Sequence, residues 1–379
     1  MTVALRKLTG TELDGWDAAA VDAPGGHVYQ SRAWAAHRAA QGWEPRFFSA
    51  GDVRASVLIR RRTPVGGGFA RIPRGPVGPG TPWTGDGSGA AIGETLAATG
   101  RWLADAGIDV TVADPEVAAS DGAYLRAIDG AGFHPVEEIQ PSRHRLALSL
   151  AGVDEAAVLA GISKQTRQRI RQAERAGVTV IRRDAAPEPA SGAVPGFERA
   201  SGDEAAALER FYALLIATGE RKSMDLQGSD DFTTWWDSAL AAGHLVYLEA
   251  RDGGPGGAVL GGLVLYRHGR RLSTAHSADV AESRHDHPGT MHLLRWRAIQ
   301  LAIAEGRTEM DLAGVDVPGA RRPPKPGEPT HGLYEHKRSF GAEWVELAGA
   351  QELVARPWLH AARRMLSGAV RSIRPGDGR

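Results

Sequence analysis

The amino-acid sequence predicts a mixed α+β fold made of two similar units that follow one another along the chain. Each half contains N-terminal helical segments, an antiparallel meander of strands, a helix that ends at a glycine, and one further strand. The helix-ending glycines, Gly107 and Gly306, occupy the same place in this order. Repetition of one plan in both halves indicates an internal duplication of an α+β unit.

Hydrophobic patterning and turn residues indicate the elements of the first unit. Ser31 is a suitable N-cap for one helix, on which Trp34 and Arg38 lie one turn apart. The expected helices span 11–24, 31–41, 90–106 and 120–131, and the expected strands span 45–50, 54–62, 68–73, 108–113 and 143–149.

The second unit begins with a charged helix over 162–177, which Ser163 caps and Gly177 ends. The other expected helices span 203–218, 230–242 and 290–305, and the strands span 244–250, 258–266, 271–277 and 308–313. The predicted first domain is 1–150, completed by 331–379, and the second is 151–330.

Bulk composition is typical of a globular protein: of 379 residues, 42% are hydrophobic and 24% are charged. No window approaches the roughly 18 apolar residues of a membrane-spanning helix, and the N-terminus lacks the pattern of a secretory signal. Because the chain has no cysteine, it forms no disulfide, thiolate zinc site or thiol nucleophile. We expect a cytoplasmic protein, and its net charge of zero disfavours a general DNA-coating role.

Positive charge is concentrated in one segment, 161–183, which has seven basic residues and one acidic residue. On a helix, Lys164, Arg167, Arg171 and Arg175 fall on one stripe. Two interpretations stay open here: a solvated basic face, or a helix that contacts the phosphates of a nucleic acid.

The segment 331–345 contains Lys337, one of only five lysines against forty arginines. In so arginine-rich a chain, a lysine indicates a position that needs a compact ammonium rather than a planar guanidinium. Phe340 and Trp344 are apolar anchors nearby, and Gly341 permits a turn. Lys337 is therefore either a surface lysine at the start of a strand or part of a reaction centre.

An acetyl-CoA-dependent acetyltransferase grips the cofactor pyrophosphate with backbone amides of a glycine-rich loop at a helix N-terminus. The corresponding segment, 283–291, has one glycine, Gly289, and Pro288 removes an amide. His285 and His287 lie in the same segment, but without a third spaced ligand they indicate a loop and not a metal site. We expect neither a metal nor a bound cofactor.

Short motifs follow one another in a characteristic order along nearly the whole chain. They are Gln30-Ser31 with Trp34 and Arg38, Pro73-Arg74-Gly75-Pro76, Asp114-Pro115, the Lys164–Val178 helix and its end, Thr218-x-x-Arg221, Asp311-Leu312-x-Gly314 and His336-Lys337-x-x-Phe340-Gly341. In these the chain resembles the Fem (FemABX) family of aminoacyl-tRNA-dependent peptidyltransferases, which have two tandem acetyltransferase-like (GNAT) domains. It lacks the helical-hairpin arm of some members and so resembles the armless ones.

The resemblance implies roles for matched positions. Lys337 would lie at the acyl-transfer centre and Asp114 near the acceptor peptide. Arg221 and Arg38 would bind the diphosphate of a uridine-diphosphate-linked peptide, with Arg38 in place of a lysine common in the family. Aminoacyl-tRNA would be the co-substrate, and the stripe formed by Lys164, Arg167, Arg171 and Arg175 would contact it.

The implied reaction is attack of an amine on the ester carbonyl of aminoacyl-tRNA, which adds an amino acid to a peptidoglycan precursor. The amine must lose a proton, the carbonyl oxygen must be stabilised, and the leaving ribose hydroxyl must be protonated. Lys337 is suited to stabilising the carbonyl oxygen. Asp114 is suited to orienting the amine, and as a base it would need a raised pKa.

Two departures from the family concern the acceptor. The segment 271–277 lacks the tyrosines of family members, and His336 stands where an aromatic residue often precedes the lysine. A small peptide or natural-product intermediate is therefore an alternative to a UDP- or lipid-linked muropeptide. An acyl-CoA N-acyltransferase or a non-catalytic relative is the alternative from another class.

A last amphipathic helix is expected over 356–374, with Trp358, Met365 and Ile373 on its apolar face. Such a helix either packs on the first domain or makes a peripheral contact with anionic lipid at the inner face of the membrane.

Overall fold

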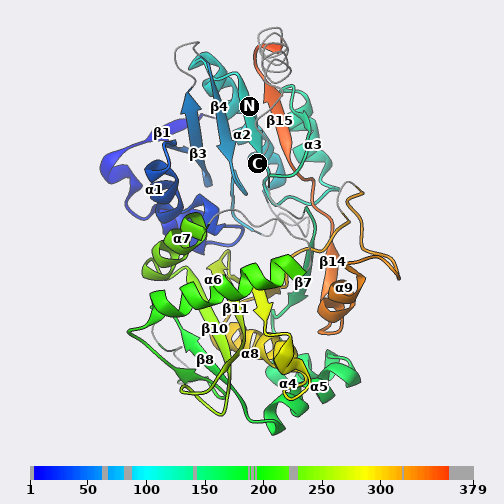
Figure 1. The fold of residues 1–379 in the computed structure, drawn as a ribbon. Coiled ribbons are helices and arrows are strands. Elements are labelled where there is room, and N and C mark those ends of the chain that lie inside the picture. The colour runs from blue at the N-terminus through cyan, green and yellow to red at the C-terminus, as the bar shows by residue number, and fades with distance from the viewer. Residues whose placement is uncertain are drawn as a thin grey trace, which may run out of the picture. The chain divides into compact units, whose positions relative to one another are not determined.

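The computed structural model describes residues 4–61, 67–80, 88–139, 143–186, 188, 192, 194–221, 229–317 and 320–357. The chain forms two compact units: unit 1 comprises Met1–Gly15, Arg38–Ile139 and Ala348–Arg379, and unit 2 comprises Trp16–His37 and Gln140–Leu347. Figure 1 traces the elements along the chain from blue to red. The expected helix over 356–374 lies outside the described residues, apart from Arg356 and Pro357.

Unit 1 is built on a mixed sheet with the strand order β1-β2-β3-β4-β5-β15-β6. Its strands are β1 (Arg6–Leu8), β2 (Glu44–Ala50), β3 (Val53–Arg61), β4 (Gly68–Ile72), β5 (Val110–Ala113), β6 (His134–Pro135) and β15 (Gln351–Val354). Strands β4 and β5 pair in parallel, and Ile72 lies opposite Ala113. Helices α2 (Gly89–Asp105) and α3 (Gly122–Asp129) bury Leu96 and Tyr124 in the core with these strands. Helix α1 (Arg32–Ala40) spans the boundary between the units.

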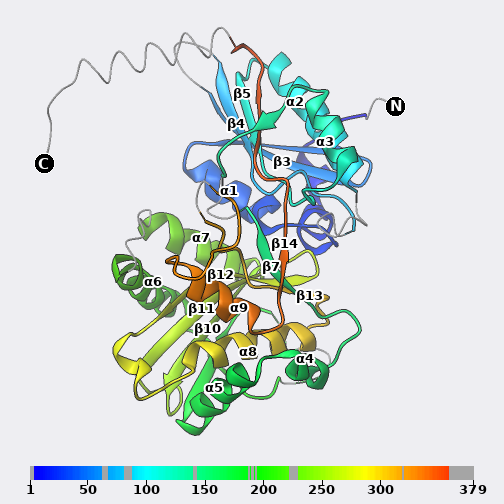
Figure 2. The same cartoon turned by 90° about the vertical axis from the view of Figure 1, so that its right-hand side faces the viewer.

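Unit 2 is built on a second mixed sheet with the order β14-β7-β13-β12-β11-β10-β8-β9. Its strands are β7 (Arg145–Ser149), β8 (Val178–Arg183), β9 (Glu198–Arg199), β10 (Leu245–Asp252), β11 (Val259–His268), β12 (Arg271–Asp279), β13 (Glu309–Asp311) and β14 (Glu343–Val345). Its helices are α4 (Glu155–Gly161), α5 (Lys164–Arg175), α6 (Glu204–Arg221), α7 (Ser229–Ala241), α8 (Thr290–Ala304) and α9 (His331–Arg338). Helices α5 and α8 share one core with the strands, and α6 and α7 share another (Figure 2).

Both units repeat the predicted plan. In unit 1 the meander β2–β3–β4 leads through α2 to β5, which is parallel to β4. In unit 2 the meander β10–β11–β12 leads through α8 to β13, which is parallel to β12. The mixed α+β class and the two similar units predicted from the sequence are therefore confirmed.

The unit boundaries differ from the predicted ones at three segments because of strand and turn pairing. Residues 143–150, expected to close the first domain, belong to unit 2, since β7 pairs with β13 in that sheet. Residues 331–347 belong to unit 2, since β14 pairs with β7 in that sheet. Residues 16–37 also belong to unit 2, where the Val21 carbonyl accepts a hydrogen bond from the Gly269 amide. The expected helix over 11–24 is divided into a short 3-10 helix at Gly10–Leu13 and a short π-helix at Ala18–Asp22.

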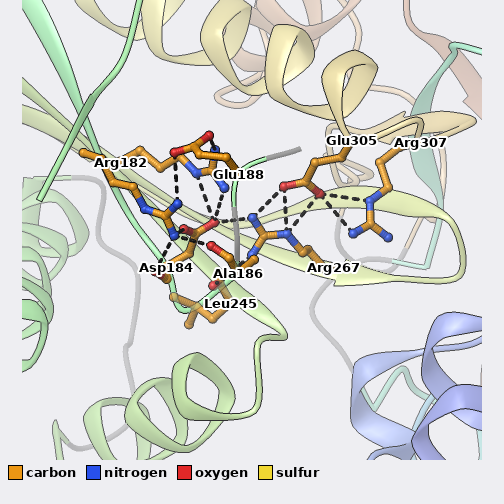
Figure 3. Close-up of polar contacts among 9 residues, drawn as sticks. Arg182, Asp184, Ala186, Glu188, Leu245, Arg267, Glu305 and Arg307 are labelled. Carbon is orange, nitrogen blue, oxygen red and sulfur yellow. Dashed lines mark hydrogen bonds and ion pairs between the residues drawn. The ribbon is translucent and has the colours of Figure 1, made fainter. Parts of the chain in front are cut away.

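Buried ion pairs hold one end of the unit 2 sheet, as Figure 3 shows. Asp184, at the end of β8, pairs with Arg182 at 2.9 Å and also with Arg267 of β11. Arg267 also donates to Glu305, which follows α8. Glu305 in turn pairs with Arg307 at 3.0 Å. Because each buried charge has an opposite partner, the network links two strands to a helix without leaving a desolvated charge alone.

Within the described residues, no helix combines the length and the apolar character needed to cross a membrane.

Candidate functional site

Lys337 lies on α9 and is buried, with 4% of its surface exposed. Its Nζ donates hydrogen bonds to the carbonyl oxygens of Ala313 and Gly314, both at 3.2 Å. The interpretation as a surface lysine at the start of a strand is therefore wrong. The segment is helical. The buried amino group has two carbonyl hydrogen-bond partners, as a buried polar group requires.

The turn after β13 presents the two carbonyl oxygens to Lys337. Asp311 accepts a hydrogen bond from the Ala313 amide at 2.7 Å, and Ala313 has a left-handed φ of 61°. Asp311 also pairs with Arg145 of β7 at 3.3 Å. The Asp311-Leu312-x-Gly314 motif thus shapes the turn that holds the lysine, because the aspartate stabilises a backbone conformation that alanine rarely adopts.

The surroundings of Lys337 disfavour its charged form. Burial lowers its pKa well below the usual value, and the positive charges of Arg295 and Arg145 act in the same direction. Asp311 and Asp316 oppose the shift without reversing it. With two hydrogen bonds made, Nζ keeps one further position, which is an N–H in the ammonium and a lone pair in the amine.

Two histidines and one arginine form a hydrogen-bonded chain of side chains that includes His336, the residue before Lys337. Arg295 of α8 donates through Nε to His336 Nε2 at 2.9 Å, and His336 Nδ1 lies 3.2 Å from His292 Nε2. The two imidazole rings meet edge to face, with centroids 4.4 Å apart. We did not expect this chain, although Arg295 within the apolar run Leu293–Trp296 was a signal that could have indicated it.

Asp114 is completely buried in unit 1, immediately after β5. Its Oδ1 accepts the Arg74 amide at 2.6 Å, and its Oδ2 lies 3.6 Å from the Arg74 guanidinium. Burial raises the pKa of Asp114 to about 6, although the Arg74 charge and hydrogen bond act to lower it. The carboxylate stabilises the left-handed turn at Arg74, whose φ is 51°. The carboxylate is buried among protein groups, and its Oδ2 makes no hydrogen bond within the described residues.

Three guanidinium groups of unit 1 gather around one aromatic ring. The Cζ atoms of Arg38, Arg60 and Arg71 lie 5.6, 4.6 and 5.7 Å from the centroid of the Trp43 ring. Arg60 and Arg71, which sequence reasoning missed, join Arg38 in this cationic platform. Arg71 also lies within electrostatic reach of Asp114, which acts to raise its pKa against the larger lowering by burial.

Arg221 ends α6 and lies against the end of β12 in unit 2. One Nη donates to Thr218 Oγ1 and to the Asp279 carbonyl, each at 3.0 Å. The Thr218-x-x-Arg221 motif is therefore an internal contact that orients the guanidinium. The Asp279 carboxylate, 3.8 Å away, is shared with Arg284.

The predicted basic stripe of α5 divides into two parts. Lys164, Arg171 and Arg175 are exposed, which suits either a solvated face or a phosphate contact. Arg167 is half-buried instead, and its guanidinium donates to the carbonyls at the end of α4, including Leu159 at 3.2 Å. Arg167 is therefore a C-terminal cap of α4, and a role in tRNA contact is not favoured for it.

The N-terminus of α8 is closely covered by α5. Gly289 has a φ of 90°, and a Cβ atom at this position would lie 2.1 Å from the Arg169 carbonyl oxygen. The Thr290 hydroxyl donates to the His287 carbonyl at 2.8 Å. The segment 283–291 therefore packs against protein at the helix end where an acetyl-CoA pyrophosphate would need free amides.

The predicted site residues fall into both units. Arg38 and Asp114 belong to unit 1, whereas Arg221, Lys337 and helix α5 belong to unit 2. Across the described ranges, no group of three or more histidine, aspartate or glutamate side chains is placed to hold a metal ion.

Comparison with known proteins agrees with this architecture. Residues 161–338 match the family model described as an acetyltransferase (GNAT) domain. Comparison with curated protein sequences gave no match. Together with the repeated plan, these findings define a protein of two GNAT-like units.

The crystal structure of FemX is similar to this chain, with a TM-score of 0.73 at 17% identity over 94% of this chain and 99% of that chain. L-PGS from Bacillus licheniformis has a TM-score of 0.48 at 10% identity, covering 87% and 90% of the two chains. A tandem GNAT protein from the clavulanic acid biosynthesis pathway has a TM-score of 0.43 at 13% identity, covering 83% of each. The expected resemblance to the Fem proteins is thus confirmed in the fold. The GNAT match and this fold support an acyltransferase role.

Proposed function

We propose that the protein is an aminoacyltransferase that moves an amino acid from aminoacyl-tRNA to an amine of a peptidoglycan precursor or related peptide. The observation that carries this proposal is Lys337, buried on two backbone carbonyls at the position that the Fem resemblance matches to the acyl-transfer centre. The FemX-like fold supports it.

Lys337 lies at the centre where the acyl group passes from the ribose oxygen to the acceptor amine. An incoming amine attacks the ester carbonyl carbon, a C–N bond forms, and the C–O bond to the ribose breaks. Two carbonyl hydrogen bonds orient Nζ and leave its third position for the reacting atoms. A preorganised group of this kind contributes roughly 10²–10³ in rate, because it needs no reorientation during the reaction.

Acceptor recognition in this proposal uses arginines. Within unit 1, Arg38, Arg60 and Arg71 form one cationic platform. Within unit 2, and considered separately, Arg221 is an oriented guanidinium. Guanidinium groups suit phosphate oxygens, so the platform favours an acceptor that carries a diphosphate. Asp114 supports this region by holding the Arg74 turn.

An acyl-CoA donor is the competing proposal, and the match to an acetyltransferase domain favours it. The covered N-terminus of α8 argues against it, because Gly289 packs on the Arg169 carbonyl where the cofactor phosphates would lie. Aminoacyl-tRNA is therefore the preferred donor.

The test is a transfer assay with charged tRNA and a UDP-linked peptide, using Lys337→Met. We expect a loss of at least ~10²-fold in transfer from a folded protein, because loss of a preorganised group costs that much. The carbonyls of Ala313 and Gly314 lose their donor, so the free energy of unfolding should fall by about 1–3 kcal/mol. Lys325→Met, at an exposed lysine, is the matched control and should retain activity.

Unchanged transfer by Lys337→Met would show that Lys337 is not part of the acyl-transfer centre. Transfer from acetyl-CoA in the absence of tRNA would favour the competing donor, and activity on a small peptide but not the UDP-linked peptide would change the acceptor class.

A further inference from the structure

A buried arginine, which has no carboxylate partner among the described residues, contacts the residue before Lys337. Arg295 is 2% exposed, its Nε donates to the His336 ring, and its Nη1 is buried with no hydrogen-bond partner in the part of the chain that the structure describes. Buried guanidinium groups are normally paired with carboxylates, because an unpaired charge is costly to desolvate. Here the acceptor is an imidazole nitrogen, so the positive charge is not neutralised.

The direction of the hydrogen bonds follows from arginine, which can only donate. His336 Nε2 accepts from Arg295 and so carries no proton, which leaves the ring proton on Nδ1. That proton is donated to His292 Nε2. Both imidazoles are neutral in this arrangement, and burial together with neighbouring positive charges lowers the pKa of His336 to about 2 and of His292 to about 4.

Because both imidazoles are neutral, they do not offset the positive charge of Arg295. The charged groups within electrostatic reach of Nζ come from every neighbouring element: Arg295 from α8, Arg145 from β7, Asp311 from β13 and Asp316 from the following loop. Asp311 is already paired with Arg145. Burial and the positive charge of Arg295 both act to lower the pKa of Lys337.

We infer that the chain His292–His336–Arg295 is a positioning device for Lys337, which holds an unpaired guanidinium within reach of Nζ and so keeps its third position open as a lone pair. This inference rests on the proposed function of Lys337 and deepens it. It replaces the expected ammonium, which would stabilise the carbonyl oxygen, by an amine that moves a proton.

The proton balance of the reaction is then complete within the site. As the acceptor nitrogen forms its bond to the carbonyl carbon, it gives a proton to Lys337 Nζ. As the C–O bond breaks, Nζ returns that proton to the leaving ribose oxygen. The lysine ends as it began, and the products are an amide and a free hydroxyl.

The test measures the lysine directly by NMR of the full chain labelled with ¹³Cε-lysine. With only five lysines in the protein, the spectrum is simple, and the Lys337 signal is the one missing in Lys337→Arg. We expect its titration midpoint well below those of the other lysines. Arg295→Gln can still donate to His336 but has no charge, and it should raise the midpoint by about 1 to 3 pH units.

Matched variants separate this effect from general disturbance. Arg297→Gln removes a charge from the same helix that is paired with Glu174, and it should leave the Lys337 midpoint unchanged. His336→Phe keeps a ring but removes the acceptor of Arg295, and it should raise the midpoint by a smaller amount than Arg295→Gln. This variant carries the test if Arg295→Gln does not fold.

An ordinary Lys337 midpoint in the unaltered protein, or a midpoint that neither variant moves, overturns the inference. Neither result depends on transfer activity, so failure of the proposed function is a separate finding. Where transfer is measurable, its rising limb with pH should move upward in Arg295→Gln along with the NMR midpoint.

Discussion

Burial changes the chemistry of individual side chains in opposite directions at the two predicted catalytic positions. It lowers the pKa of the Lys337 ammonium and raises that of the Asp114 carboxyl to about 6, because a desolvated site disfavours either charge. Lys337 keeps a free position on Nζ, whereas Asp114 accepts the Arg74 amide through Oδ1 and has Oδ2 3.6 Å from the Arg74 guanidinium. Under the proposed function the two residues would differ in role: Lys337 would take part in the reaction, and Asp114 would hold the Arg74 turn.

Two substitutions at Asp114 separate its shape from its charge. Asp114→Asn keeps the acceptor for the Arg74 amide and should retain transfer within ~10-fold, whereas Asp114→Ala should lose about 1–3 kcal/mol of stability because a buried donor is left unsatisfied. Chemical denaturation and the transfer assay measure both effects.

The pH dependence of the Asp114 variants follows from the raised pKa. The folded protein binds this proton up to about pH 6, whereas the unfolded chain loses it near 3.8, so ionised Asp114 costs stability as pH rises through that window. Asp114→Asn should therefore be relatively more stable at pH 7 than at pH 4. A large loss of transfer in Asp114→Asn with normal stability would show that the charge itself acts on the substrate.

At the scale of elements, one helix face has two uses. The hydroxyl and backbone contacts of Ser163 and Thr166 begin α5 and link it to Ser339 after α9. The Arg167 side chain caps the C-terminus of α4. The basic face that is accessible to solvent or to a partner therefore consists of Lys164, Arg171 and Arg175. A helix with this arrangement can bind phosphates while its apolar side packs on α8.

The exposed part of the stripe should bind tRNA. Arg171→Gln with Arg175→Gln should weaken tRNA binding and lower the slope of log affinity against log salt by roughly 1 to 2, since each phosphate contact releases counterions. Filter binding at several salt concentrations measures this.

Arg167→Gln is the informative control on the same helix. It should lower thermal stability through α4 and leave the salt slope unchanged. If the double variant leaves the slope unaltered, α5 is a solvated face and tRNA binds elsewhere.

At the scale of the whole molecule, buried ionisable groups set how the fold responds to acid. In unit 2, Glu305 is desolvated, which raises its pKa, but hydrogen bonds and charge from Arg267 and Arg307 outweigh this, so its pKa is lowered. His336 and His292 are held neutral by burial and nearby cations. As pH falls, each of these groups contributes less to the free energy of unfolding.

Stability should therefore decline as pH falls from about 6.5. The unfolded chain protonates His336 and His292 in this range and the folded protein does not, so the unfolded state gains protons and the free energy of unfolding falls by up to about 1.4 kcal/mol per pH unit for each group. Urea unfolding at pH 7.5, 6 and 5 measures the decline.

A double variant, His292→Gln with His336→Gln, should make that decline shallower because these two sites no longer titrate. His276, whose pKa burial also lowers to about 4, still contributes in both proteins. Asp114 acts in the opposite direction between about pH 4 and 6 but is a single group. Stability that is constant or rising toward pH 5 in the unaltered protein would contradict the neutral state of the histidine pair.

Much of the fold could be predicted because its signals are local. Ser163 caps α5 and Gly177 follows its end, as expected. The helix and strand around Gly306 also lie where the pattern placed them. By contrast, β8 was not expected, because its Arg182 and Arg183 looked like surface charges and are instead buried in ion pairs with distant carboxylates.

The sequence by itself determined the mixed α+β class, the repeated plan, and the residue types at the candidate site, because periodicity, caps and motif order are properties of neighbouring residues. Only the tertiary structure decided that Lys337 is buried on two carbonyls, that Arg295 and two histidines lie behind it, and that Arg167 caps a helix. Those facts depend on which segments meet, and desolvation and charge act through space between residues such as Arg295 and Lys337 that are far apart in the chain.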